Sequence, residues 1–520
     1  MFTQIHSATL QGLEAIPIKV EVDAYSSGAI PRFTIVGLPD NAVKESLERI
    51  LAAIRLNGLR LNAKSIVVNL APADLKKEGS GLDLPIAVGI LSASEILLFN
   101  EQMLADSMFI GELSLDGTIL PVKGALPVSI KARKLGVKHL FVPKENEREA
   151  AVVDNLAVYG VNTLQEVIDF LEGKISLQPT IVNTREEFYK NQTAFDADFA
   201  DVKGQENVKR AFEVAAAGGH NIILVGSPGC GKSMMAKRLP SILPPLSLHE
   251  SLETTQIHSI AGKLHKDISL ISQRPFRSPH HTISDVALVG GGNTFMPGEI
   301  SLAHNGVLFM DELPEFSRTV LETLRQPLED RIITVSRAKY NFTLPCSFML
   351  VASMNPCPCG YHGDLTHQCV CTPGQIQRYM NKISGPLLDR IDIHCEVQAV
   401  PFAQLSQMKP GEPSASIRER VIAARKIQLE RFRPFKGIHC NAQMTEHMIH
   451  EFAEPDDASL NMLRMAMERM KLSARAYSRI LKVARTIADL AGSEKVLSVH
   501  IAEAIGYRNL DRGDWAERGV

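Results

Sequence analysis

The sequence predicts an α/β protein with several domains and a helical C-terminal segment. Residues 14–171 alternate short β-like runs with helical periodicity, and residues 199–400 add apolar runs typical of buried strands. Residues 417–507 are almost entirely helical in period. The chain has 520 residues, which exceeds one ordinary domain of about 150 residues.

Composition and charge exclude several classes of protein. The chain is 45% hydrophobic and 22% charged, which is typical of a globular protein and argues against disorder or fibrous structure. The formal net charge of -2 means that any surface for nucleic acid must be local. There is no signal-peptide pattern and no run of about 18 apolar residues, so we expect a cytoplasmic protein without a membrane segment.

The pattern predicts four segments. Residues 1–175 form an α/β domain, with strands at 16–22 and 65–70 and helices at 40–56 and 84–98. The polar residues 176–198 form a linker. Residues 199–400 form the second α/β domain, with buried strands at 221–225, 306–310 and 348–352, and residues 401–520 form a helical lid.

A P-loop follows the first buried strand of the second domain and precedes a helical run. It is made by Gly226, Ser227, Pro228, Gly229, Cys230, Gly231, Lys232 and Ser233. Glycines let backbone N–H groups surround phosphates, a lysine reaches the β- and γ-phosphates, and a serine ligates Mg²⁺. The pattern therefore predicts an ATP site, and the structural alternative is a tight strand-to-helix turn that binds nothing.

An acidic pair ends the second buried strand. Asp311 would then lie near the Mg²⁺ ion, and Glu312 would orient and polarise the attacking water. An apolar run that ends in two acids is weak evidence alone, because many such pairs are exposed turns. Together with the P-loop it predicts ATP hydrolysis.

Four cysteines lie close together after the third buried strand, within residues 357–371: Cys357, Cys359, Cys369 and Cys371. Two close pairs can supply four thiolates for a tetrahedral Zn²⁺ ion. We expect a structural zinc site, with reduced thiols or a redox disulfide as the alternatives.

The second domain resembles the AAA+ ATPases. The resemblance rests on the P-loop, the acidic pair and residues 199–205. Residues 199–205 resemble the segment that lines the adenine pocket in that superfamily. The resemblance implies that Asn355 is a first sensor on a strand between the P-loop strand and the acidic-pair strand. It also implies that Arg390 is an arginine finger for a neighbouring subunit and that Arg475 is a second sensor, with Arg479 as the alternative. An oligomer follows, because a finger that acts in trans leaves an isolated subunit incomplete, and the resemblance implies that this oligomer is a homo-hexamer.

Longer motifs resemble the magnesium-chelatase-like branch of these ATPases and, within it, the ComM/YifB family. They are Phe276–Ser284, Pro297–His304, Ser384–Arg390 and Ala484–Leu490. The resemblance implies an ATP-driven hexameric DNA motor that promotes branch migration in homologous recombination and natural transformation. Its partners would be single-stranded or branched DNA and recombination proteins. Candidate DNA contacts lie in two loops, 260–300 and 329–344: Arg274, Arg277, Arg331, Arg337 and Lys339. The alternative for each side chain is an ordinary polar surface.

The first domain resembles the Lon protease domain, carried by residues 109–117 and 120–124. Lon peptidases need a serine that is activated by a lysine. The two matching positions hold Gly81 and Leu126, and Ser80 and Lys123 are each displaced from them. We therefore expect a domain that lacks the catalytic dyad. A Lon-like ATP-dependent protease, a chelatase-type remodelling subunit and a non-enzymatic ATP switch are the alternative functions.

Overall fold

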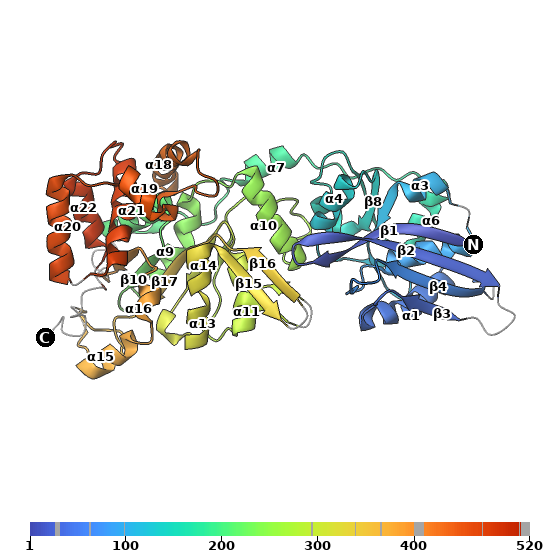
Figure 1. Ribbon diagram of the computed structural model, residues 1–520, viewed down its shortest axis with the longest axis horizontal. Helices are drawn as coiled ribbons and strands as arrows, with labels where there is room; N and C mark the ends of the chain where they lie inside the picture. The colour runs from blue at the N-terminus through green and yellow to red at the C-terminus, as the bar shows by residue number, and fades with distance from the viewer. Residues whose placement is uncertain are drawn as a thin grey trace. The chain divides into compact units, whose positions relative to one another are not determined.

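The computed structural model describes residues 1–26, 32–61, 64–97, 99–292, 295–337, 340–364, 367–399, 410–470, 472–508 and 510. The chain divides into two compact units (Figure 1). The first contains Met1–Lys190, Leu248–Ser272 and Gly292–Pro297, and the second contains Asn191–Ser247, Gln273–Gly291 and Gly298–Val520.

The first unit is built on a seven-stranded sheet in the order β3-β4-β2-β1-β5-β8-β9. The strands are β1 (Phe2–Gln11), β2 (Glu14–Ser26), β3 (Phe33–Val36), β4 (Lys64–Ala71), β5 (Ser107–Phe109), β8 (His139–Pro143) and β9 (Ala157–Val161). Strand β2 is antiparallel to β1 and β4, and the remaining pairs are parallel.

Strand β2 shows why this sheet has one buried face. Ile18, Val20 and Val22 are fully buried, while Lys19 between the first two and Asp23 after the third are exposed. Successive side chains of a strand point to opposite faces, so this alternation directs every second residue into the core.

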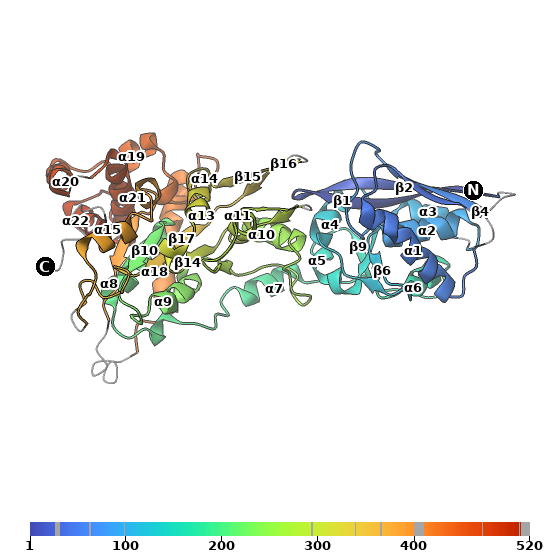
Figure 2. The same ribbon diagram turned by 90° about the horizontal axis from the view of Figure 1, so that it is seen from below.

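Helices cover the sheet of the first unit. They are α1 (Asn41–Leu56), α2 (Asp83–Ala93), α3 (Glu101–Ala105), α4 (Ala125–Lys134), α5 (Glu147–Ala150), α6 (Leu164–Leu171), α7 (Thr184–Asn191) and α10 (Leu248–Ile260). Helix α1 begins at Asp40, whose carboxylate accepts a hydrogen bond of 2.8 Å from the backbone of Val43. Helix α2 packs against β1 and β2, and α1 packs beside it (Figure 2).

The second unit contains a five-stranded sheet in the order β11-β14-β17-β10-β18. The strands are β10 (Ile222–Val225), β11 (Phe276–Arg277), β14 (Val307–Met310), β17 (Met349–Met354) and β18 (Ile393–Glu396), and all the pairs are parallel. Every residue of β10, β14 and β17 is buried. Such burial on both faces explains why these strands are continuous apolar runs. A separate hairpin joins β15 (Ile332–Arg337) to β16 (Tyr340–Pro345).

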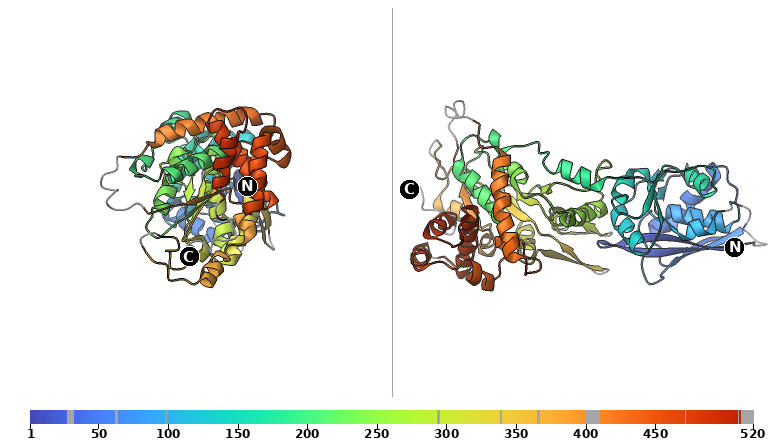
Figure 3. Two further views of the ribbon diagram at one scale, coloured as in Figure 1. Left: turned by 90° about the vertical axis from the view of Figure 1, so that its left-hand side faces the viewer. Right: turned by 90° about the horizontal axis from the view of Figure 1, so that it is seen from above.

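Helices complete the second unit. They are α8 (Glu206–Gly218), α9 (Lys232–Arg238), α11 (Asp285–Val289), α12 (Glu299–Leu302), α13 (Arg318–Thr323), α14 (Arg325–Asp330), α15 (Pro373–Met380), α16 (Gly385–Leu388), α18 (Ser414–Phe432), α19 (Glu446–Phe452), α20 (Asp457–Met470), α21 (Ala474–Leu490) and α22 (Ser498–Gly506). The last five gather into one group (Figure 3). Their apolar side chains share one hydrophobic core with the sheet, so the segment expected as a lid packs as part of this unit.

The structure differs from the expected organisation in three places. The segment expected as a linker, 176–198, contains helix α7. Helix α10 lies within the segment expected in the ATPase core, yet it packs on α4 of the first unit. Strand β1 precedes the first strand that the sequence indicated and pairs with β2 along its whole length. The expected boundary at residue 400 lies outside the described residues.

Among the residues that the structure describes, no helix is both long enough and apolar enough to cross a bilayer.

Candidate active site

The candidate site lies where three adjacent parallel strands end. The P-loop follows β10, the acidic pair follows β14, and Asn355 follows β17. The expectation that the strand before Asn355 lies between the other two is confirmed, because β17 pairs with both β14 and β10. Ligands of open α/β sheets bind at the carboxyl ends of the strands, so this edge is the place to look for a nucleotide.

The P-loop conformation depends on its glycines. Gly229 and Gly231 have φ values of 78° and 93°, in the left-handed region that favours glycine. A Cβ atom on Gly226 would lie 2.2 Å from the carbonyl oxygen of Val397, which leaves no room for a side chain.

Lys232 is turned into this loop and is almost fully buried. Its Nζ donates to the carbonyl oxygens of Gly226 at 2.7 Å and Ser227 at 2.9 Å, and to Oδ1 of Asn355 at 3.2 Å. The structure therefore brings together Lys232 and Asn355, for which the sequence predicts phosphate binding and sensing. One ammonium group lies between the loop and the end of β17.

Ser233 and Asp311 also meet, as a magnesium site requires. The Ser233 hydroxyl donates to Oδ2 of Asp311 at 2.7 Å. Two neighbouring ligands of an octahedral Mg²⁺ lie about 3.0 Å apart when each Mg–O distance is about 2.1 Å. The hydroxyl and carboxylate oxygens are hard ligands at a fitting separation. They can hold Mg²⁺ with the nucleotide.

Ser353 is a site residue that the sequence analysis missed. Its hydroxyl donates to Oδ1 of Asp311, and it is completely buried on β17. This contact orients the carboxylate, so that Oδ2 faces Ser233. The sequence signal that could have identified Ser353 is a single hydroxyl residue in an otherwise apolar strand that neighbours the strand before the acidic pair.

Glu312 lies beyond the end of β14 in a left-handed conformation, with φ of 55°. Its carboxylate is half exposed, and Oε2 lies 3.5 Å from Nδ1 of His281. The ring of His281 also packs edge-on against Phe316 and lies beside His280. His281 is a second residue of the site to which the sequence analysis gave no role, although its motif was noticed.

Arg390 is held inside its own subunit. Its guanidinium donates to the carbonyl of Pro386 at 2.7 Å and to the carboxylate of Glu329. The hydrogen bond from Arg390 lowers the pKa of Glu329, and the positive charges of Arg475 and Arg479 act in the same direction. Arg475 itself is exposed in the first turn of α21. The structure thus places three arginines close enough to Glu329 to lower its pKa.

Arg479, the alternative second sensor, has a different role in the structure. It donates to the carboxylate of Asp392, and to the carbonyl of Arg390 at 3.4 Å. Asp392 is almost fully buried and also lies 3.1 Å from Nδ1 of His220. Burial would raise the pKa of Asp392, but the Arg479 guanidinium and the His220 ring together outweigh burial and hold this pKa well below its usual value. Arg479 therefore joins helix α21 to the segment that carries Arg390.

Three of the five cations expected to contact DNA are engaged inside the second unit. Arg274 donates to the carbonyls of Pro244 and Asn305, Arg277 forms a two-bond ion pair with Glu299, and Arg331 donates to Ser347. These contacts fix loops, because each guanidinium already has internal acceptors. The side chain of Arg337 and all of Lys339 lie outside the described residues.

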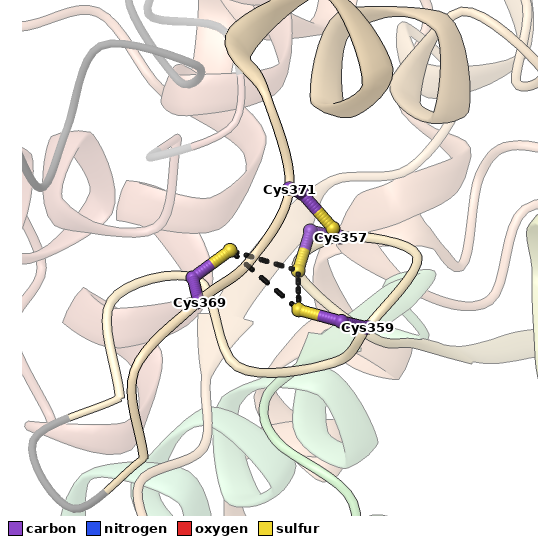
Figure 4. A group of neighbouring side chains, drawn as sticks. All are labelled: Cys357, Cys359, Cys369 and Cys371. Carbon is purple, nitrogen blue, oxygen red and sulfur yellow. Dashed lines mark hydrogen bonds between the residues drawn. The ribbon is translucent and has the colours of Figure 1, made fainter.

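The four clustered cysteines form a compact group (Figure 4). One sulfur atom from each lies within 4.8 Å of the other three: Cys357, Cys359, Cys369 and Cys371. All four are free thiols, as are the other four cysteines of the chain. Burial raises the pKa of the Cys359 thiol, but hydrogen bonds with the backbone of Tyr361 and Val370 and with the neighbouring cysteines together outweigh burial and lower this pKa to about 6.

Comparison with known families finds magnesium chelatase along most of the chain. Three models match: "Magnesium chelatase, subunit ChlI" over residues 198–405, "Subunit ChlI of Mg-chelatase" over 20–146, and "Magnesium chelatase, subunit ChlI C-terminal" over 411–508. The P-loop, the acidic pair, Asn355 and Arg390 all fall within the first.

Full-length relatives are also found. Competence protein ComM of Haemophilus influenzae is 42% identical over 98% of this chain and 97% of its own length. The uncharacterized protein YifB of Escherichia coli is 43% identical over the same shares. Lon protease 2 of Bacillus subtilis is 28% identical over only 24% of this chain and 22% of its own length. The Lon similarity is therefore partial.

The two positions matched with the Lon dyad cannot supply peptidase chemistry. A Cβ atom placed on Gly81 would lie 3.6 Å from Cγ1 of Val122. Leu126 is completely buried. The displaced Ser80 donates to the carboxylate of Glu112. A glycine and a buried leucine offer neither a hydroxyl nor an amine.

Proposed function

Because the chain belongs to the ComM/YifB family of magnesium-chelatase-like AAA+ proteins, we propose that it is an ATP-driven motor that acts on DNA. The observation that carries the ATPase part is the meeting of Ser233 with Asp311 and of Lys232 with Asn355. The side chains of these four residues, which follow the ends of three adjacent strands, therefore lie together at one edge of the sheet.

The proposed chemistry assigns one task to each residue. Lys232 binds the β- and γ-phosphates of ATP, and Ser233 and Asp311 hold the Mg²⁺ that neutralises charge on those phosphates. Glu312 orients the attacking water and accepts its proton. Asn355 positions the γ-phosphate from the end of β17, and Arg475 contacts the nucleotide from α21 in the same subunit.

The complete site needs a neighbouring subunit. Arg390 completes the site of that neighbour, where its charge stabilises the transition state of phosphoryl transfer. Glu329 holds Arg390 within its own subunit in the structure, so assembly must exchange this carboxylate for the neighbour's phosphate. A closed homo-hexamer places every Arg390 at such an interface.

We propose that the hexamer promotes branch migration of DNA junctions in homologous recombination and natural transformation. Similarity to a competence protein over nearly the whole chain supports this choice among motor functions. Single-stranded or branched DNA is the substrate, and recombination proteins are the expected partners. Because three of the five candidate cations are engaged internally, the other two, Arg337 and Lys339, are the proposed DNA contacts. The first unit serves assembly or DNA handling, since its dyad positions hold Gly81 and Leu126.

Turnover of ATP and movement of a synthetic four-way junction test the proposal together. We expect wild-type protein to hydrolyse ATP faster with junction or single-stranded DNA and to exchange the strands of the junction. Lys232→Ala and Glu312→Gln should abolish both activities. Turnover that is indifferent to every DNA tested would refute a DNA motor while leaving an ATPase.

Matched controls separate the site from its surroundings. Lys237→Ala removes an exposed lysine one turn further along α9 and should leave turnover unchanged. Glu451→Gln removes an exposed carboxylate of α19 whose partner is His447 and should have little effect. Peptide hydrolysis abolished by Ser80→Ala would instead favour a rearranged protease.

A further inference from the structure

We infer that the four clustered cysteines bind one Zn²⁺ ion and that this ion holds one wall of the nucleotide site in place. Two parts of the structure support the inference: the arrangement of the sulfur atoms, and the contacts of the cysteine loop with Pro228 and Asn355. The second part rests on the proposed ATP site.

The sulfur atoms have the spacing of a tetrahedral metal site. The distances are 3.3 Å from Cys357 to Cys359, 3.7 Å from Cys357 to Cys369 and 3.6 Å from Cys359 to Cys369. A tetrahedron with Zn–S distances of about 2.3 Å has sulfur atoms about 3.8 Å apart. A disulfide needs about 2.05 Å. The spacing is therefore that of ligands around a common ion.

The chemistry of the ligand set selects the metal. Four thiolates are soft donors, which favour Zn²⁺ over Mg²⁺ or Ca²⁺. Four protein ligands also fill the tetrahedral coordination of zinc and leave no position for water or substrate. The ion would therefore act on structure and would take no part in hydrolysis.

The cysteine loop begins beside the sensor and returns to the P-loop. Cys357 follows Asn355 by two residues. Gly360 has a φ of 89°, and a Cβ atom on it would lie 2.7 Å from Cδ of Pro228 and 4.0 Å from Cγ of Asn355. The backbone at Gly360 thus lies directly against the P-loop, between the two cysteine pairs.

Helix α15 extends this contact on the other side of the loop. It begins just after Cys371 and places the hydroxyl of the buried Tyr379 by the backbone of Asn355. Lys382, after the end of α15, forms an ion pair with Glu315 beyond the acidic pair. A metal that ties the Cys369 and Cys371 arm to Cys357 and Cys359 therefore fixes both ends of a segment that borders the nucleotide.

Zinc content and nucleotide affinity of the full-length chain test this inference. Metal is measured by mass spectrometry, Co²⁺ replacement by thiolate charge-transfer absorption, and affinity by titration with fluorescent ADP. We expect one Zn²⁺ per chain in the wild type and none after the double change Cys369→Ser and Cys371→Ser. The double variant should bind ADP roughly ten-fold more weakly, as expected when a binding wall is displaced by about 1 Å or less.

Two further variants separate the metal from the wall. Gly360→Ala keeps all four thiols, so it should keep zinc and still weaken ADP binding, because its Cβ would press on Pro228. Cys346→Ala removes a buried cysteine outside the cluster and should retain both zinc and affinity. If the double variant fails to fold, removal of the metal from wild-type protein by a chelator, followed by added Zn²⁺, provides the same comparison.

Each outcome decides one part. Wild-type protein expressed with ample zinc that contains none would overturn the metal site. Metal-free variants that bind ADP like the wild type would overturn the link to the P-loop. Failure of DNA to stimulate turnover would leave both results intact, whereas failure of the wild type to bind any nucleotide would refute the ATP site and leave the zinc measurement valid.

Discussion

Removal of the Arg479 guanidinium should destabilise the second unit and disturb Arg390. Asp392 is only 2% exposed and depends on this guanidinium for its charge balance. Breaking a buried ion pair by removing one partner costs about 3–5 kcal/mol, because the other charge is left buried. Asp392 keeps hydrogen-bond contacts with His220 at 3.1 Å and the backbone of Asn221 at 3.3 Å. The loss for Arg479→Met should therefore lie near the lower limit, about 3 kcal/mol.

Thermal unfolding of the full-length protein checks this value. A large domain loses about 2 °C of Tm per kcal/mol, so the transition of the second unit should fall by about 6 °C. The double variant Asp392→Asn with Arg479→Met leaves no buried charge and should recover much of the loss. ATP turnover should fall in the single variant, because Arg479 also donates to the carbonyl of Arg390.

The dependence on pH gives a second check. Since Arg479 holds the pKa of Asp392 below its usual value, the stability that the pair contributes is fully present above the unfolded-state pKa of about 3.9 and is lost as pH falls below it. Without the guanidinium, burial raises the pKa of Asp392 in Arg479→Met, so the variant takes up a proton there more readily than the wild type. The difference in stability between wild type and Arg479→Met should therefore be largest near pH 7 and should shrink as the solution becomes more acidic. A single variant as stable as the wild type at pH 7, or a double variant no better than the single, would refute the reasoning.

Ser353→Ala should lower kcat by roughly ten-fold with little change in ADP affinity, because Asp311 loses the donor that orients it. Steady-state kinetics at saturating Mg²⁺ measure this effect, and an unchanged kcat would contradict the prediction. Arg390→Ala and Lys232→Ala proteins should each be inactive, yet mixing them should restore up to about a quarter of wild-type turnover, the fraction of interfaces that combine both intact residues; no recovery in mixed assemblies that light scattering shows to form would exclude an Arg390 that acts in trans. Phe109→Ala should destabilise the first unit by about 3–5 kcal/mol, because this side chain is fully buried, and equal melting curves for variant and wild type would contradict the packing argument.

Much of the nucleotide site could be predicted from the sequence. The P-loop has fixed spacing and its neighbouring strands are apolar throughout, because parallel strands covered on both faces need no polar alternation. The pairing of Ser233 with Asp311 then follows from the rule that the carboxyl ends of parallel strands meet at one edge. The grouping of the four cysteines could also be predicted, since all four lie within a short segment of the sequence.

The internal partners of the expected functional arginines could not be predicted, because charge alone does not reveal a side chain's partner. Arg274 and Arg277 looked like DNA contacts in a glycine-rich insertion, and the structure pairs them with backbone carbonyls and Glu299. Arg479, the alternative second sensor, forms an ion pair with Asp392. Each partner is distant in the sequence, so only the folded chain brings donor and acceptor together.

The sequence by itself determined the chemistry available at each strand end: a phosphate-binding loop, two acids, a polar sensor and four thiols. Local spacing and burial patterns suffice for this, because they act within a few residues. The tertiary structure alone decided which groups are free to react. It turned Asp311 toward Ser233 through Ser353, bound Arg390 to Glu329, and laid Gly360 against Pro228. These arrangements depend on packing between segments far apart in the chain, which no local pattern records.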